Sequence, residues 1–122
     1  MNRVVHFDLP VTDPERSIQF YSDVFGWKFH KWEGPMDYWL ITTGEGAPGI
    51  NGGMGRRQDP AQTVTCTMEV ENVDATCQAI EAAGGQIIMP KMAIPGVGWL
   101  AQFKDPNGLI SGVIQSDPTA GQ

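Results

Sequence analysis

Hydrophobic and polar residues alternate along the first stretch of the chain, from Val4 to Val11. This period of two predicts a strand with one buried face, because successive side chains point to opposite sides. The apolar side is the natural one to lie beneath a helix. Its members are Val5, Phe7, Leu9 and Val11. The opposite side presents His6 and Asp8, two residues apart.

A helix is predicted directly after this strand. Asp13 is a suitable N-cap, Pro14 fits the first helical position, and Gly26 is a typical helix stop. Between them the spacing changes to the helical period and gives an apolar stripe. The stripe consists of Ser17, Phe20, Tyr21, Val24 and Phe25.

The same unit occurs twice in the chain. One offset of 59 residues superimposes a strand end, a helix cap, a helix stop and a glycine of a later strand. The matched pairs are Val11 with Val70, Asp13 with Asn72, Gly26 with Gly85, and Gly53 with Gly112. The second predicted helix begins at Asn72 and stops at Gly84-Gly85.

Each half contains three further predicted strands. They are 28–32, 38–42 and 50–55 in the first half, and 86–89, 99–103 and 109–115 after the strand at 63–70 and the second helix. The segment 50–55 is rich in glycine, so a backbone or a ligand is expected to approach it closely. The order predicts an α+β fold of two tandem βαβββ modules, forming a curved mixed sheet with helices outside and a cup-shaped cavity. The single domain would comprise module one at about 3–57, a linker at 58–62, module two at 63–115 and a tail at 116–122.

Composition narrows the functional classes. The chain has 122 residues, which is one ordinary domain, and a net charge of −6 with a pI of about 4.6. This acidity argues against nucleic acid or an anionic membrane surface as a partner. No apolar run approaches the ~20 residues of a membrane span, and no signal-peptide core is present. Cys66 and Cys77 form no CxxC motif, which favours reduced thiols in a cytoplasmic protein.

Three short motifs together resemble a known family. They are His-Phe-Asp-Leu-Pro-Val-x-Asp at 6–13, Phe-Tyr-x-x-Val-Phe-Gly-Trp at 20–27, and Asp-Pro-Asn-Gly at 105–108. In this order, with the duplicated module, they resemble the vicinal oxygen chelate superfamily, also called the glyoxalase/bleomycin-resistance/dioxygenase superfamily. The resemblance extends over roughly Arg3 to Gln115. Residues 38–54 look like those of small single-domain proteins related to lactoylglutathione lyase.

The resemblance also implies positions for metal ligands, on the first and last strands of each half. In this chain those positions hold His6, Thr65, Gly53 and Gly112, of which only His6 matches. A catalytic metal site normally takes three or more protein ligands. No cofactor is therefore predicted, and a divalent metal belongs only to the alternative function below.

The predicted ligand-binding residues surround His6. They are His6, Asp8, Tyr38, Trp39, Thr65, Thr67, Trp99 and Gln102. His6 would contact the substrate or act as general base, with Asp8 orienting it, or would be a hydrogen-bonded structural residue. The aromatic residues would form a stacking wall for a flat ligand, or would pack in the core or a dimer interface.

Three functions are compatible with these residues. The first is binding of an apolar or aromatic small molecule in the cup, as in the metal-free bleomycin-resistance branch. The second is a metal-dependent lyase or isomerase of the glyoxalase type, so enzymatic activity is left open. The third is a non-catalytic accessory domain. The expected partners are an unidentified small molecule and a second copy of the chain, without nucleic acid or membrane.

Overall fold

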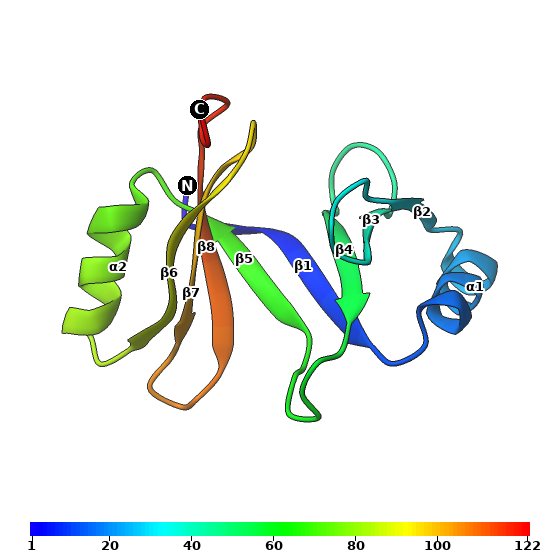
Figure 1. Ribbon diagram of the computed structural model, residues 1–122, viewed down its shortest axis with the longest axis horizontal. Coiled ribbons are helices and arrows are strands. Elements are labelled where there is room, and N and C mark those ends of the chain that lie inside the picture. The colour runs from blue at the N-terminus through cyan, green and yellow to red at the C-terminus, as the bar shows by residue number, and fades with distance from the viewer. The chain divides into compact units, whose positions relative to one another are not determined.

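The computed structural model describes residues 1–122 and contains eight strands and two helices (Figure 1). Their bounds are β1 Arg3–Val11, α1 Pro14–Phe25, β2 Lys28–Lys31, β3 Tyr38–Thr42, β4 Asn51–Arg56, β5 Thr65–Glu69, α2 Val73–Ala82, β6 Gln86–Ile94, β7 Gly98–Lys104 and β8 Ile110–Ser116. The predicted α+β class and the repeated βαβββ order are confirmed. Neither helix has the length and apolarity that crossing a membrane requires.

The chain divides into two compact units, each described here by itself. The first unit is His6–Thr65, and the second is Cys66–Gln122 with Met1–Val5. The first unit has the strand order β2-β3-β4-β1, in which β1 and β4 are parallel and β3 is antiparallel to both of its neighbours. The second has the order β5-β8-β7-β6 with the same parallel and antiparallel pattern. The strands of each unit are therefore of mixed direction.

The helices begin and end where their capping residues predict. The Asp13 carboxylate accepts a hydrogen bond from the Arg16 N–H at 3.2 Å, and Gly26 closes α1 with φ 73°. A left-handed residue at this position costs little only when it is glycine. In α2 the Asn72 side chain accepts from the Ala75 N–H at 2.9 Å.

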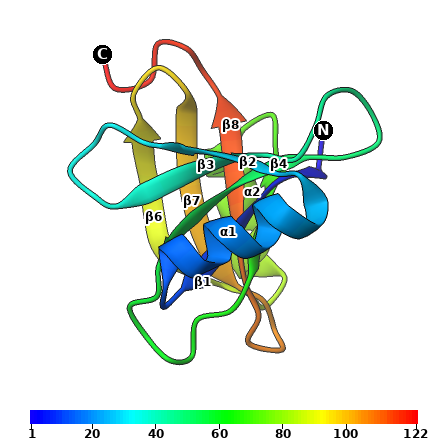
Figure 2. The same ribbon diagram turned by 90° about the vertical axis from the view of Figure 1, so that its right-hand side faces the viewer.

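Helix α1 packs on its sheet through a narrower stripe than predicted. Tyr21 stacks on Trp27 at 4.8 Å between ring centroids, and Trp27 contacts Phe7 of β1 at 5.7 Å, so these rings join helix to strand. Figure 2 shows α1 lying in front of the strands of its unit. Phe20 and Phe25, by contrast, are 55% and 59% exposed, and Val24 is exposed too. Residues three and four apart share a helix face, so Pro14, Ile18 and Tyr21 face the sheet together, whereas Phe20 lies on another face. Phe25 shares the face of Tyr21 and stacks on it at 6.1 Å, but at the end of the helix it stays exposed.

The core of the second unit lies between α2 and its sheet. It consists of Val70, Val73, Ala101 and Val113, with Cys77, Ile80, Trp99 and Phe103 packed against it. The indole N–H of Trp99 donates to Asp117 at 3.1 Å. Trp99 is therefore half-buried under the helix, and its polar atom is satisfied within the chain.

Strand β6 is longer than the predicted 86–89. It continues through Pro90 to Ile94, with register shifts between Ile87 and Met89 and between Met89 and Met92. Proline lacks the N–H needed in a central strand, but β6 is the outer strand of its unit's order, where such irregularity is tolerated. The predicted strand end at Met89 was therefore wrong.

The glycines of β4 are closely approached, as predicted, by the Phe7 backbone oxygen at Gly52 and also by side chains. The Phe7 ring lies over Gly52, and the Tyr38 hydroxyl lies over Gly53 on the opposite side of the sheet. A Cβ at Gly53 would collide with that hydroxyl, whereas a Cβ at Gly55 would meet the Tyr38 ring at an ordinary 3.6 Å. Gly53 thus makes the space in which Tyr38 lies.

This difference between two glycines of one strand is testable. Gly53→Ala should destabilise the fold by roughly 1–3 kcal/mol, because the Tyr38 side chain must leave its position. Gly55→Ala, the matched control, should change the free energy of unfolding by less than about 0.5 kcal/mol. Urea denaturation of both variants measures the two values. Equal values would show that Tyr38 does not depend on Gly53.

Candidate functional site

Three polar side chains meet on one side of the first unit's sheet. His6 Nε2 lies 3.4 Å from Asp8 Oδ1 and 3.3 Å from the Tyr38 hydroxyl oxygen. The Tyr38 hydroxyl donates to the same Asp8 oxygen at 2.5 Å. The predicted contact between His6 and Asp8 is therefore present, and Tyr38, another predicted site residue, joins it.

Strand register explains why residues 30 positions apart meet. Asp8 pairs with Gly53 across β1 and β4, and Gly53 pairs with Leu40 across β4 and β3. Paired residues share a side of a sheet, as do residues two apart in one strand. His6, Asp8, Tyr38 and Leu40 consequently lie on the side opposite Phe7 and α1, which we call the His6 face.

Asp8 is held as a carboxylate. Partial burial alone would raise its pKa, but the hydrogen bonds from His6 and Tyr38, together with the nearby imidazole, lower the pKa of Asp8 below its ordinary value. For Tyr38 the same contacts act in the opposite direction. Burial, followed by the negative charge and hydrogen bond of Asp8, raises the pKa of Tyr38 well above its usual range. The phenol therefore keeps its proton at physiological pH.

Apolar side chains border this polar group. Trp32 follows β2 and packs edge-to-face on the Tyr38 ring, with 6.5 Å between centroids. Trp32 is 41% exposed and Leu40 is 43% exposed. About a third of the His6 side chain is also accessible. The His6 face thus presents an imidazole beside exposed aromatic and aliphatic surface, which is a combination suited to a small organic ligand.

Trp39 lies on the other side of the sheet from His6. It pairs with Met54, which pairs with Leu9 on the α1 side of β1. Its ring is flanked by Lys31 Nζ at 5.6 Å and Arg56 Cζ at 5.9 Å from the centroid. The structure therefore does not bring Trp39 to the predicted ligand site, because adjacent residues in a strand point to opposite faces.

The predicted residues of the second unit separate in the same way. Thr67 pairs with Gly112, and Gly112 with Gln102, so these positions share the side of the sheet opposite α2. Thr65, the last residue of the first unit, lies two residues before Thr67 on the same strand, β5, and so on the same side of that strand. Trp99 lies on the α2 side, in the core. Of the two roles considered for Trp99, the structure shows packing in the core and not a wall for a ligand.

The residues at the implied ligand positions do not fit a metal ion. No group of three or more His, Cys, Asp or Glu side chains in the structure could hold one. The space in front of Gly53 is filled by the Tyr38 hydroxyl, and a Cβ on Gly112 would lie 2.9 Å from Thr67 Oγ1. His6 Nε2 is already engaged by Asp8 and Tyr38. A metal would need donors that these positions lack.

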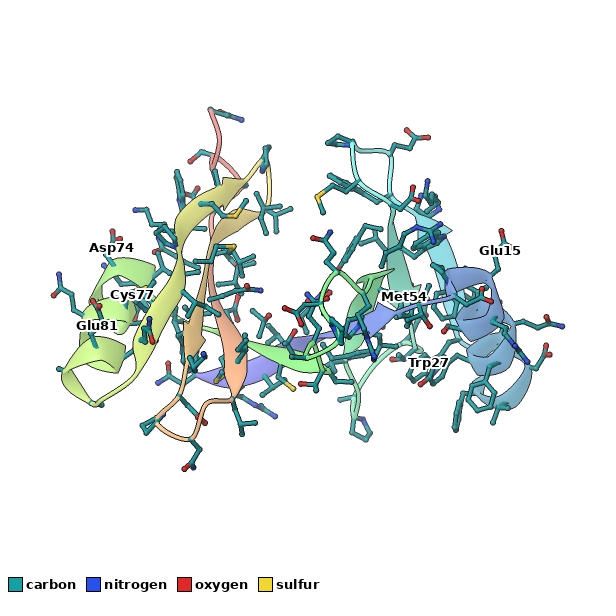
Figure 3. All side chains as sticks on the ribbon, turned by 60° about the horizontal axis from the view of Figure 1, so that its bottom comes forward. Glu15, Trp27, Met54, Asp74, Cys77 and Glu81 are labelled. Carbon is teal, nitrogen blue, oxygen red and sulfur yellow. The ribbon has the colours of Figure 1, made fainter.

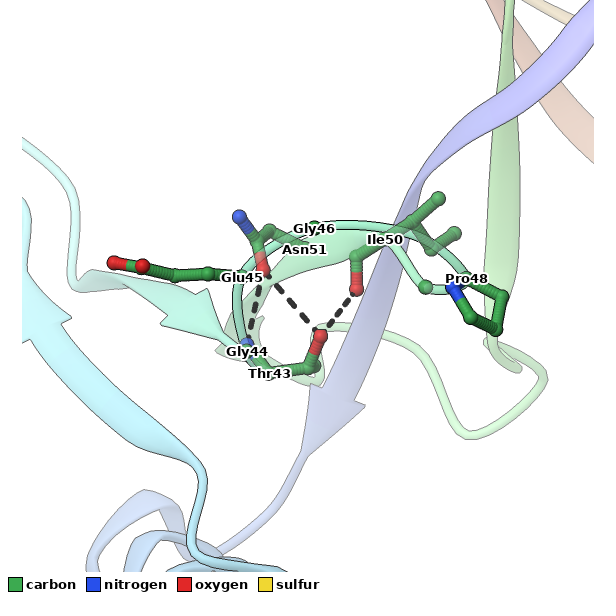
Figure 4. A pocket seen from close by; sticks show the side chains of 8 residues that line it. Thr43, Gly44, Glu45, Gly46, Pro48, Ile50 and Asn51 are labelled. Carbon is green, nitrogen blue, oxygen red and sulfur yellow. Dashed lines mark hydrogen bonds between the residues drawn. The ribbon is translucent and has the colours of Figure 1, made fainter.

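Two small pockets lie elsewhere. One of about 160 Å³ is the hollow of the loop from Thr43 to Asn51 (Figure 4). Thr43 closes this loop by donating its N–H to Asn51 Oδ1 at 2.9 Å and its hydroxyl to the Ile50 carbonyl at 2.6 Å. The other, of about 190 Å³, lies beside α2 between Ile80 and Phe103. Neither is lined by His6.

The cysteines offer no nucleophile. Cys66 and Cys77 are both unpaired, and Cys77 lies on α2 with Asp74 and Glu81 (Figure 3). Burial, and then the charges of these two carboxylates, raise the pKa of Cys77, while Lys91 acts weakly against them. The thiol therefore remains protonated near neutral pH and serves packing.

Sequence reasoning missed two features of the site. It did not identify the bond between Tyr38 and Asp8, and it did not consider Leu40 as a ligand contact. Gly53 was the feature of the sequence that could have revealed this contact, because a glycine within a strand often indicates close approach by another group. Alternation in 38–42 could also have separated Tyr38 from Trp39, because neighbouring residues cannot share a face.

Comparisons with known proteins agree with this fold. The Glyoxalase/Bleomycin resistance protein/Dioxygenase superfamily matches residues 3–110. A lactoylglutathione lyase of Haemophilus influenzae is 27% identical over an alignment of 117 residues, which covers 87% of this chain and 87% of that protein. The structure of methylmalonyl-CoA epimerase from Mycobacterium tuberculosis superimposes with a TM-score of 0.70 at 16% identity, covering 94% of this chain and 88% of that one.

A second structure gives the same result. A methylmalonyl-CoA epimerase variant from Streptomyces coelicolor, in complex with 2-nitronate-propionyl-CoA, has a TM-score of 0.71 at 13% identity and covers 100% and 99% of the two chains. These two structural likenesses establish the fold. The match over residues 3–110 shows that the chain belongs to the Glyoxalase/Bleomycin resistance protein/Dioxygenase superfamily.

Proposed function

We propose that this protein binds an apolar or aromatic small molecule on the His6 face without using a metal. The observation that supports this most directly is the position of Tyr38. Its hydroxyl fills the space in front of Gly53 and binds Asp8, which in turn contacts His6. His6, the one residue that matches an implied metal-ligand position, therefore forms hydrogen bonds within the chain.

The surroundings of His6 suit such a ligand. Trp32 and Leu40 offer exposed apolar surface next to the Tyr38 ring, and the accessible part of His6 adds a polar contact. A pocket with a few polar groups among apolar ones gives both affinity and orientation. His6 would contact the ligand, while Asp8 and Tyr38 would fix the position of the imidazole.

The assembly and location of the protein are part of the proposal. A homodimer is supported by the large apolar side chains that α1 exposes, Phe20, Val24 and Phe25. A cytoplasmic location is supported by two cysteines without a disulfide. Net acidity supports a partner other than nucleic acid or membrane.

A metal-dependent lyase or isomerase of the glyoxalase type is the second candidate. It is favoured by the similarity to the lactoylglutathione lyase of Haemophilus influenzae over most of both chains. Three of the four implied ligand positions count against it, because they hold Thr65, Gly53 and Gly112. A catalytic metal needs three or more suitable ligands. A non-catalytic accessory domain would show neither ligand binding nor bound metal.

A screen of small aromatic compounds tests the proposed function. A compound present at 100 times its Kd should stabilise the protein by about 2.7 kcal/mol, seen as a rise in Tm. His6→Ala should abolish the rise. Gln19→Ala is the control, because Gln19 is exposed on α1, on the other side of the sheet from the His6 face. If the His6→Ala protein responds like the wild type, the His6 face is not the binding site.

Metal content separates the two candidates. Protein purified without a histidine tag or chelator should contain far less than one Zn, Ni, Fe or Mn per chain by elemental mass spectrometry, and a chelator should leave its Tm unchanged. The physical reason is the donor set, in which only His6 remains. Stoichiometric metal that is lost in His6→Ala would instead favour the lyase or isomerase.

The lowered pKa of Asp8 predicts how stability depends on pH. Because the folded state favours the Asp8 carboxylate, its contribution is present above the ordinary aspartate pKa and is lost as the pH falls through the lowered pKa. Asp8→Asn should therefore destabilise the protein by about 1 kcal/mol at neutral pH and by less at about pH 2–3. Urea denaturation at both pH values measures this, with the exposed Asp23→Asn as control. A penalty independent of pH would contradict the assigned role.

A further inference from the structure

The hydrogen-bonding capacities around His6 determine where its proton lies. At neutral pH the Asp8 side chain is a carboxylate, which can only accept hydrogen bonds. Tyr38 has one hydroxyl hydrogen, which it donates to Asp8 Oδ1 at 2.5 Å. Both oxygens near His6 Nε2 therefore face it with lone pairs, at 3.4 Å and 3.3 Å.

This leaves one arrangement for the neutral imidazole. Two lone-pair atoms beside Nε2 are compatible only with a hydrogen on that nitrogen, shared between Asp8 and Tyr38. A neutral imidazole has one N–H, so its other nitrogen, Nδ1, holds the lone pair. Within the first unit, the structure gives Nδ1 no hydrogen-bond partner, and about a third of the side chain is accessible.

We infer that His6 Nδ1 is the hydrogen-bond acceptor of the His6 face, and that its ligands are apolar or aromatic molecules carrying an N–H or O–H donor. This inference rests on the proposed function, since it assigns the chemistry of the same face. Trp32 and Leu40 would contact the apolar body, and His6 would bind the donor. Asp8 and Tyr38 act as positioning residues, because they set the tautomer without contacting the ligand.

The two positioning residues should respond differently to substitution. Tyr38→Phe removes one acceptor but leaves the Asp8 carboxylate, so the hydrogen stays on Nε2. Asp8→Asn replaces the carboxylate with an amide that can donate, and it also frees the Tyr38 hydroxyl to donate to Nε2. The hydrogen should then move to Nδ1. A merely structural role for Asp8 would leave the tautomer unchanged.

Long-range ¹H–¹⁵N correlation spectra of the imidazole rings test this without any ligand. The chain has two histidines, so His30→Gln leaves the signals of His6 alone. Spectra are recorded about two pH units above the ordinary imidazole pKa of ~6.5, where such a ring is neutral. The expected result is hydrogen on Nε2 in the wild type and in Tyr38→Phe, and on Nδ1 in Asp8→Asn. Hydrogen on Nδ1 in the wild type would overturn the inference even if no variant folds.

Indole and 1-methylindole test the ligand class as a matched pair. They share an apolar body, but only indole has an N–H donor. Indole should bind about tenfold more tightly to the wild type and should shift the Nδ1 resonance. In Asp8→Asn, where Nδ1 carries the hydrogen, the preference should disappear.

The outcomes separate this inference from the proposed function. Equal binding of the two indoles by the wild type would overturn the acceptor role of Nδ1 while leaving small-molecule binding intact. If neither indole binds, the ligand class assigned here fails together with the proposed function, and the tautomer measured in the free protein still reports the hydrogen-bond geometry independently.

Discussion

The contact between the Tyr38 hydroxyl and Gly53 is the constraint on which the His6 face depends. Any side chain at position 53 would occupy the space of that hydroxyl. With glycine there, Tyr38 reaches Asp8, and Asp8 becomes a charged acceptor beside His6. The absence of a Cβ at position 53 thus determines which group the Asp8 carboxylate binds. It also keeps the Tyr38 phenol protonated and sets the surroundings of the His6 imidazole.

The second unit repeats the backbone of this arrangement without its chemistry. The pairing of Asp8 with Gly53 recurs, 59 residues on, as the pairing of Thr67 with Gly112. There too a hydroxyl lies close to the glycine, since Thr67 Oγ1 would be 2.9 Å from a Cβ on Gly112. The strand register is the same in both halves, but at this pair of positions only the first half carries an ionisable side chain, that of Asp8. The repeat therefore preserves backbone geometry more strictly than chemical function.

Local patterns predicted most of the fold because the forces behind them are local. Alternation in β1 placed His6 and Asp8 on one face, and the caps at Asp13 and Asn72 gave the helix starts, since each depends on residues a few positions apart. The faces of Trp39 and Trp99 were not predictable from residue type. Each lies in a largely apolar strand, where only pairing with distant strands decides which side is covered by a helix.

The same limit applies to the site, and it bears on what family membership implies for its chemistry. His6 occupies a position that the resemblance assigns to a metal ligand, and a ligating histidine must offer a lone pair to the ion. Here the bond between Tyr38 and Asp8, 30 residues apart, surrounds Nε2 with acceptors and requires it to donate. The residue type is the one expected, and Nδ1 keeps a lone pair, but the other implied positions supply no metal donor. A matched position therefore does not by itself make a metal site, because the groups around the histidine determine what it can bind.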